Sequence, residues 1–123
     1  MPVKHQTYFK PARQNKFNAR RAEYDGYYYM SGAEARYAKE LDLMVMAHEI
    51  EGWDRQYKID IRVKGKHITN HYVDFIIFHN DGSKEFREVK GYPSEAWLIK
   101  KRLVEATQNI PYTVIPANQV GRG

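Results

Sequence analysis

The sequence predicts one α/β domain in which a mixed β-sheet is flanked by helices, with the element order α-β-β-β-α-β. Apolar residues spaced three and four apart predict the first helix, over residues 31–49. Alternating or apolar runs bounded by turn residues predict three consecutive strands, at 53–62, 71–78 and 84–90. A second helix over 97–106 and a short strand over 112–115 complete the order. The 123 residues are enough for one ordinary core.

The first predicted elements begin at turn and cap residues. Asp25-Gly26 favours a tight turn before a short strand at 27–30. Ser31 suits a helix N-cap, and the helix that follows has one largely apolar face. That face consists of Ala35, Ala38, Leu41, Met44, Val45 and His48.

Turn residues also separate the later elements. The strand at 53–62 places Tyr57, Ile59 and Ile61 on one face, and Gly65 marks the turn that follows. Asn80-Asp81-Gly82 marks the next turn, and Ser94 caps the second helix. The Lys100-Lys101-Arg102 run of that helix is expected to face solvent or a phosphate backbone.

The net charge of +5 is concentrated at the N-terminus. Residues 1–22 contain six bases and no acid, whereas the rest of the chain contains 14 bases and 15 acids. We therefore expect a basic, largely flexible arm at 1–22 and a single domain at 23–123. Such arms commonly contact nucleic acid phosphates. The expected contacts are Lys10, Arg13, Lys16, Arg20, Arg21, Lys100 and Lys101.

Composition excludes several classes of protein. The chain has no cysteine, so it has neither disulfides nor a thiolate metal site. The polar, basic N-terminus does not resemble a signal peptide, and no apolar run approaches the ~20 residues of a membrane span. We expect a cytoplasmic protein without a membrane partner.

Asp74, Glu88 and Lys90 lie inside strands that are otherwise largely apolar. Buried charges are costly unless they are paired or bound to a cation. Glu88 and Lys90 share one strand face, whereas the face of Asp74 depends on the intervening turn. A two-residue turn would place Glu88 on the opposite face, but a three-residue loop sets it directly across from Asp74. We predict the three-residue loop or an equivalent bulge, because Gly82 suits its last position.

Two opposed carboxylates repel each other unless they are protonated or bridged by a cation. Mg²⁺ prefers oxygen ligands, lowers the pKa of a bound water and neutralises charge on a phosphoryl oxygen. Lys90 can position or deprotonate that water, or stabilise the charge that develops. These residue types suit phosphodiester hydrolysis. The alternative is that Glu88 and Lys90 form only a same-strand ion pair.

The ordered set of Glu34 on a helix, Asp74 on a strand and Glu88-Val89-Lys90 on the next strand resembles the PD-(D/E)xK nuclease superfamily. The resemblance covers roughly residues 16–115 and is nearest to small phage-encoded endonucleases similar to Holliday-junction resolvases. It implies a restriction-endonuclease-like core, a homodimer, and action on branched or double-stranded DNA, in the host cytoplasm if the protein is phage-encoded. Val73 stands where the superfamily usually has a proline.

The resemblance also implies a role for each matched residue. Asp74, Glu88 and the backbone carbonyl of Val89 would ligate Mg²⁺, for which Mn²⁺ can substitute. Lys90 would activate the water, and Glu34 would approach the same site. Glu34 also fits a capping box with Ser31, so both roles remain open.

Other candidates carry weaker signals. Gln56 is either a substrate contact or an ordinary strand residue. The four-residue spacing of His67 and His71 does not indicate a metal pair on a strand. Two other functions remain open: a non-catalytic DNA-binding protein, and an RNA nuclease with the same site.

Overall fold

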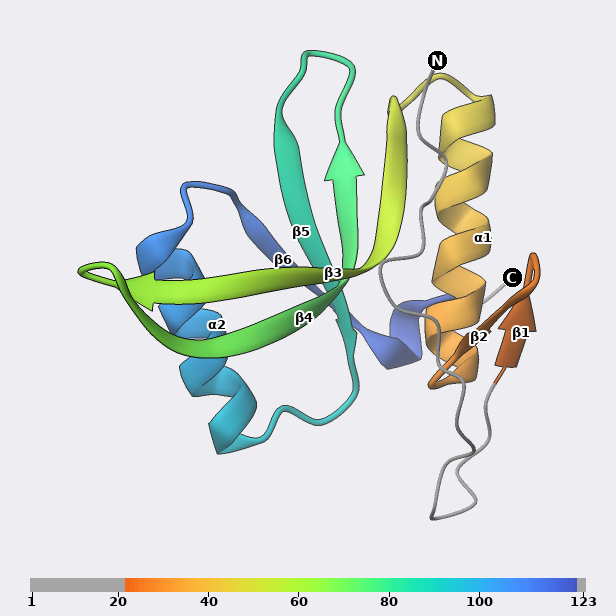
Figure 1. Ribbon diagram of the computed structural model, residues 1–123. Helices are drawn as coiled ribbons and strands as arrows, with labels where there is room; N and C mark the ends of the chain where they lie inside the picture. Colours follow the sequence, from red (N-terminus) through yellow and green to blue (C-terminus); the bar gives the residue numbers. More distant parts are fainter. Residues whose placement is uncertain (1–21, 122–123) are drawn as a thin grey trace.

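The computed structural model describes residues 22–121, and the expected arm contacts at Lys10, Arg13, Lys16, Arg20 and Arg21 lie outside them. The element order α-β-β-β-α-β is confirmed, preceded by an additional hairpin (Figure 1). The elements are β1 (Ala22–Tyr24), β2 (Tyr27–Tyr29), α1 (Gly32–Met46), β3 (Gly52–Val63), β4 (Lys66–Phe78), β5 (Lys84–Lys90), α2 (Glu95–Thr107), β6 (Tyr112–Pro116) and the 3₁₀ turn η1 (Ala117–Gln119). Ala22, which the sequence assigned to the arm, belongs to β1.

The central sheet has the strand order β3-β4-β5-β6 and is mixed. β3, β4 and β5 pair in antiparallel fashion, whereas β6 runs parallel to β5. The parallel pair requires a crossover, which α2 provides. Figure 1 shows α1 beside the β1–β2 hairpin and α2 on the other side of the molecule. The observed architecture is therefore an α/β fold with a mixed four-stranded sheet and two helices.

The core consists of two apolar clusters, one associated with each helix. Ala38 and Leu41 of α1 pack in the first cluster with Trp53, Phe75 and other residues of the sheet. The second cluster contains Val104 of α2, and its sheet residues include Ile59, Ile61, Val73, Ile76 and Phe86. Asp74 and Glu88 lie in β4 and β5, strands that contribute to both clusters.

The first helix ends three residues earlier than the sequence predicts. The amide of His48 donates to the carbonyl of Val45, and the amide of Glu49 donates to that of Met44. With His48 at φ +61, this is the Schellman arrangement of a helix C-terminus. His48 is therefore exposed and outside α1, although its spacing placed it on the apolar face.

The turn between β4 and β5 is the predicted three-residue loop. The amide of His79 donates to the carbonyl of Ser83, and Gly82 has φ +89. The paired residues that follow include Phe75 with Arg87. Extended by one residue, this register sets Asp74 directly opposite Glu88, so the predicted strand register is confirmed.

Gln56 interrupts the regular course of β3 with a left-handed backbone, φ +50. Trp53 packs in the first core cluster, whereas Tyr57 packs against the second. In a regular strand these two residues, four apart, would share a face. β4 changes cluster at the same place, between Val73 and Phe75, so both strands of the hairpin serve both clusters. The register Arg55–Phe75 and Tyr57–Val73 places Gln56 across from Asp74.

Within residues 22–121, no helix is both long enough and apolar enough to cross a membrane.

Candidate functional site

Asp74 and Glu88 link β4 and β5 where the paired register of the two strands ends. The carboxylate of Asp74 accepts a hydrogen bond from the amide of Val89 at 2.9 Å. The carboxylate of Glu88 accepts one from the amide of Asp74 at 3.2 Å. Each acid thus binds the backbone of the opposite strand, and both side chains are buried. These bonds hold the two carboxylates in fixed positions.

Burial and mutual repulsion favour the protonated forms of three acids. The pKa of Asp74 is raised well above its usual value by burial and by the charges of Glu34 and Glu88. Burial and the charge of Glu88 raise the pKa of Glu34 to about 7, and burial raises the pKa of Glu88. The structure therefore brings Glu34, from α1, to the pair that the strands position.

Lys90 provides the positive charge beside these acids. Its ammonium group favours the ionised form of Glu34, Asp74 and Glu88, so it opposes the rise of each pKa. The Lys90 Nζ also lies 5.0 Å from the centre of the Trp97 ring, a cation–π contact with the first turn of α2. Lys90 is therefore held at the site between the carboxylates and the second helix.

Glu34 takes part in the start of α1 as well as in the site. The Ser31 hydroxyl accepts a hydrogen bond from the Glu34 amide at 3.1 Å, so Ser31 is the N-cap. The same hydroxyl donates to the Glu34 carboxylate at 3.4 Å. Among the described residues the Glu34 carboxylate contacts the Ser31 hydroxyl and not its amide, so Ser31 caps the helix without the reciprocal bond of a capping box. The charge of Glu34 interacts with Asp74 and Glu88.

A polar chain that the sequence did not predict orients Glu88. The Tyr112 hydroxyl donates to the Glu88 carboxylate at 3.3 Å, and His71 Nε2 lies 2.9 Å from the same hydroxyl. The tautomer with its proton on Nε2 lets His71 donate to the Tyr112 oxygen while the hydroxyl proton goes to Glu88. Burial, together with the charges of Lys100 and Lys90, lowers the pKa of His71 to about 4, so this histidine is neutral. The parallel pairing of β5 with β6 brings Tyr112 to Glu88.

Arg55 is a second unpredicted residue near the acids. It is fully buried, lies over the rings of Tyr27 and Tyr29, and donates to the carbonyl of Tyr28 at 2.9 Å. Its charge favours the ionised form of Glu34. Arg55 thus connects the β1–β2 hairpin to the carboxylate site. Its strand neighbours Asp54, Gln56 and Lys58 are also polar or charged, so the sequence did not distinguish it.

The remaining predicted contacts lie at different distances from the acids. Gln56 is across β3–β4 from Asp74 and is partly buried. Lys100 lies close enough to His71 to lower its pKa. Lys101 pairs with Glu105 at 2.7 Å and lies over the Tyr112 ring. Lys100 and Lys101 are therefore partly buried rather than fully solvated, whereas Arg102 is exposed.

His67 and His71, four residues apart on β4, lie in different environments. His67 Nδ1 contacts Asp60 at 2.5 Å on the exposed face of the β3–β4 hairpin. His71 is buried and faces Tyr112. The two rings therefore have separate partners.

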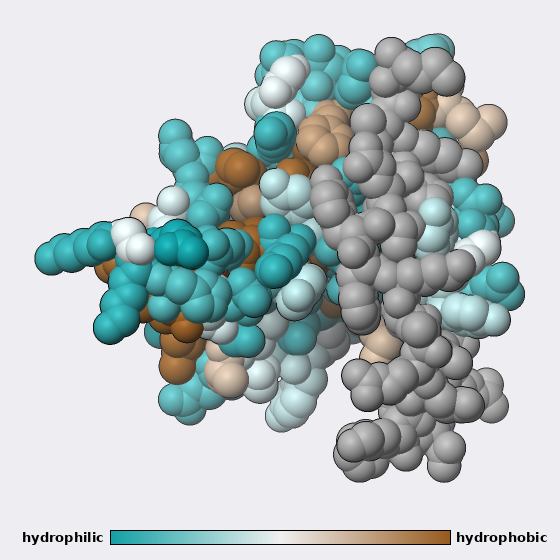
Figure 2. Space-filling view, viewed as in Figure 1, coloured by the Kyte–Doolittle hydropathy of each residue, from teal (hydrophilic) through white to brown (hydrophobic). Residues whose placement is uncertain are grey.

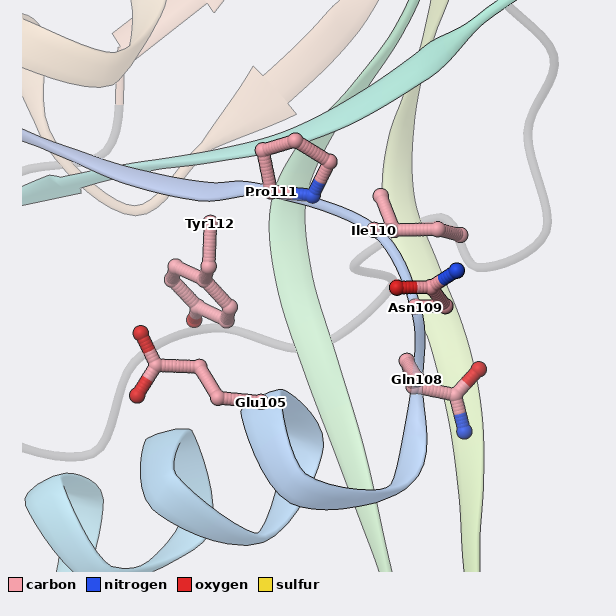
Figure 3. A pocket seen from close by; sticks show the side chains of 6 residues that line it. All are labelled: Glu105, Gln108, Asn109, Ile110, Pro111 and Tyr112. Carbon is pink, nitrogen blue, oxygen red and sulfur yellow. The ribbon is translucent and has the colours of Figure 1, made fainter.

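A cavity of about 320 Å³ lies between the end of α2 and the start of β6 (Figure 3). Its lining is Glu105, Gln108, Asn109, Ile110, Pro111 and Tyr112. It contains none of the predicted catalytic residues, and only Tyr112 links it to them through the hydroxyl on Glu88. We take the carboxylates, rather than this cavity, as the candidate site, because the perturbed pKa values are found there.

The groups that could bind a cation are the carboxylates of Asp74 and Glu88 and the backbone carbonyl of Val89. Among residues 22–121, no three acid or histidine side chains converge into a ready-made metal site. Mg²⁺ is commonly held by only one or two carboxylates, with waters and substrate phosphates completing its coordination. Asp74 and Glu88 fit that limited requirement, and their mutual repulsion would be relieved by a cation.

Comparison with known proteins gives a family but no activity. No curated protein matches the chain significantly, and neither does any solved structure. One family model matches residues 14–117, a span that includes every element from β1 to β6 and all four residues of the candidate site. The chain therefore belongs to the family described as "Protein of unknown function (DUF1064)".

Proposed function

We propose that this protein is a Mg²⁺-dependent endonuclease of the PD-(D/E)xK type that hydrolyses phosphodiester bonds in DNA, with branched or double-stranded DNA as its substrate class. The observation that carries the proposal is the opposition of Asp74 and Glu88 across β4 and β5, with Lys90 beside both. Glu34 adds a third acid to the same electrostatic cluster.

Two buried acids and a lysine also occur in structural ion pairs, so their arrangement matters. Neither carboxylate forms its main contacts with Lys90: Asp74 binds the Val89 amide, and Glu88 binds the Asp74 amide and Tyr112. All three acids have raised pKa values despite Lys90. Within the described residues, the cluster thus contains more acidic groups than one lysine can balance, as expected for a site that binds a cation.

In this proposal Asp74, Glu88 and the Val89 carbonyl would hold the cation, and Glu34 would act beside them. When bound, Mg²⁺ would lower the pKa of a water and neutralise phosphoryl charge. The reaction joins a water oxygen to phosphorus, breaks one P–O ester bond and gives a proton to the leaving oxygen. Lys90 would orient the attacking water or stabilise the negative charge on the phosphoryl oxygens. Tyr112 and His71 would keep Glu88 oriented.

The test is a cleavage panel on the full chain with Mg²⁺ or Mn²⁺. The DNA forms are supercoiled, linear, nicked, flapped and four-way-junction, and a single-stranded RNA is included. Asp74→Ala and Lys90→Ala are expected to reduce cleavage at least about 100-fold, since each removes a group at the reacting centre. The matched controls, Glu49→Gln and Lys84→Ala, replace exposed charges and should cleave as wild type does.

Each outcome of the panel separates two functions. Wild-type inactivity on every DNA form, or full activity of both Ala variants, contradicts the proposal. Cleavage of RNA alone would support the RNA nuclease instead. DNA binding that is indifferent to Mg²⁺ and to Asp74→Ala, without cleavage, would support a non-catalytic DNA-binding protein. Equal cleavage of all DNA forms would retain the nuclease and remove selectivity for branches.

A further inference from the structure

The outer half of the β3–β4 hairpin extends beyond the rest of the central sheet. β5 pairs with β4 only over residues Phe75–Phe78. β3 and β4 continue to pair beyond this point, from the pair of Tyr57 with Val73 to the pair of Val63 with Lys66. We call residues 57–73 the distal ribbon. Figure 1 shows it projecting at the left of the molecule, over α2. Its inner face is anchored, because Ile59, Ile61 and Val73 pack with Val104 of α2.

The distal ribbon has a net positive charge. It contains four bases, all exposed: Lys58, Arg62, Lys64 and Lys66. Its only acid, Asp60, contacts Arg62 at 2.8 Å and His67 at 2.5 Å. Within the part of the chain that the structure describes, the three lysines form no ion pair. The projecting end is accordingly hydrophilic in Figure 2.

The rest of the described domain has the opposite charge. Outside the distal ribbon, residues 22–121 contain nine bases and fourteen acids. The ribbon contains four bases and one acid. Positive charge in this domain is therefore concentrated on one projecting element, where it can attract a polyanion through the long-range field.

The tip of the ribbon has a defined backbone. Lys64 and Gly65 form a two-residue turn with φ +52 and φ +79, the geometry of a type I′ hairpin. Arg62 donates to the carbonyl of Gly65 at 3.0 Å and so ties the strand to the turn. A tied turn on an anchored hairpin presents its lysines at fixed positions, which reduces the entropy lost on binding.

We infer that the distal ribbon is a docking surface for duplex nucleic acid and contacts its phosphates through Lys58, Lys64 and Lys66. The choice of nucleic acid as the partner rests on the function proposed above. A two-stranded β-ribbon is narrow enough to enter the major groove of a DNA duplex. Lys66 precedes Asp74 by eight residues on β4, which is at most about 26 Å along the strand. This separation is shorter than one helical turn of DNA, about 34 Å, so one duplex could contact both residues.

The experiment measures duplex binding by the full chain with Asp74→Asn, in EDTA, so that cleavage plays no part. A fluorescent 30-base-pair duplex is titrated over a series of salt concentrations. The double variant Lys64→Glu/Lys66→Glu is compared with Lys39→Glu/Lys84→Glu, which changes the net charge equally at exposed lysines on α1 and β5. The milder variant Lys64→Gln/Lys66→Gln removes the two positive charges without adding negative ones, so it is less prone to misfold.

The ribbon Glu variant is expected to bind about tenfold or more weakly, and its log–log salt slope should fall by about 2. The Gln variant should show a smaller loss, and the control less than twofold. Equal losses in ribbon and control variants, or no loss in either ribbon variant, would overturn the inference. So would ribbon-dependent binding to phosphatidylserine vesicles without binding to the duplex.

The two proposals fail in different measurements. If the protein binds duplex DNA through the ribbon but cleaves no DNA, the docking surface is supported and the proposed nuclease activity is refuted. If wild type cleaves DNA and the ribbon variants bind normally, the docking surface is refuted and the proposed nuclease activity is supported.

Discussion

Asp74 and Glu88 lie one residue beyond the last paired residues of β4 and β5, and each accepts a hydrogen bond from a backbone amide of the opposite strand. This relationship depends on the number of residues in the Asn80–Gly82 loop. One residue fewer in a regular turn would place the two acids on opposite faces of the hairpin. The loop is remote from the acids along the strands, yet it determines whether they can act on one ligand.

Gly82→Ala tests the conformation of that loop. Gly82 has φ +89, and an added Cβ would meet no atom within 4 Å, so its cost comes from backbone strain and not from a clash. We expect a loss of about 1 kcal/mol in the free energy of unfolding, measured with urea. Gly91→Ala is the control: its Cβ would make an ordinary contact with Ala117, and stability should hold or rise slightly. Equal effects in both variants would contradict this reason.

Gln56→Val tests the left-handed residue opposite Asp74. A β-branched side chain at φ +50 should destabilise the protein by on the order of 1–3 kcal/mol. Gln56→Gly, which tolerates this conformation, should be at least as stable as wild type. Lys58→Val, two residues further along the same strand and exposed, is the control and should change stability little. Urea unfolding of the three variants gives the comparison, and a tolerated Gln56→Val would refute the strain argument.

Glu34→Gln tests the repulsion among the acids through the pH dependence of stability. Burial and Glu88 raise the pKa of Glu34 from 4.5 to about 7. Between these values the folded protein holds a proton that the unfolded chain has released. This stabilising contribution is complete below about pH 4.5 and is lost as the pH rises through about 7.

In EDTA, the Gln variant should therefore match wild type near pH 4.5 and exceed its free energy of unfolding at pH 8, by on the order of 1–2 kcal/mol. The exposed Glu49→Gln control should follow wild type at both pH values. A Glu34→Gln variant whose stability runs parallel to wild type over this range would show that Glu34 does not interact with the pair.

Added Mg²⁺ should raise the melting temperature of wild type at pH 8 but not that of Asp74→Asn.

Tyr112→Phe tests the polar chain that orients Glu88. The change removes the hydroxyl that donates to Glu88 and leaves His71 without that partner. We expect a stability loss of about 1–2 kcal/mol. If the proposed nuclease is correct, kcat should fall about tenfold with little change in KM, because Glu88 would lose orientation and not its charge. Tyr92→Phe, at a side chain 94% exposed, should change neither quantity. An unchanged kcat would remove Tyr112 from the positioning of Glu88.

Local sequence signals predicted most of the fold. Ser31 and Ser94 were recognised as helix caps, and each accepts the expected backbone amide. The Asp25-Gly26 turn and the strand over 84–90 were also predicted correctly. The end of α1 was missed, because the left-handed position after the helix is occupied by a histidine and not by the glycine that usually signals a helix end. The spacing of His48 suggested a longer helix.

The candidate site was predictable only where its geometry is local. Strand parity and the length of one loop were enough to oppose Asp74 and Glu88. Tyr112 and Arg55 were not found, since their contacts depend on which strands become neighbours. The parallel register of β6 against β5 follows from the α2 crossover, and no pattern within either strand specifies it.

The sequence by itself therefore determined the order of the elements, their caps and turns, and the opposition of two acids, because short-range sterics and hydrogen bonding control these features. The tertiary structure alone decided three others. It brought Glu34 to the charges of Asp74 and Glu88, it placed Tyr112 between His71 and Glu88, and it left a basic ribbon projecting from an acidic domain. These depend on packing between segments distant in the chain, where burial and charge act through space.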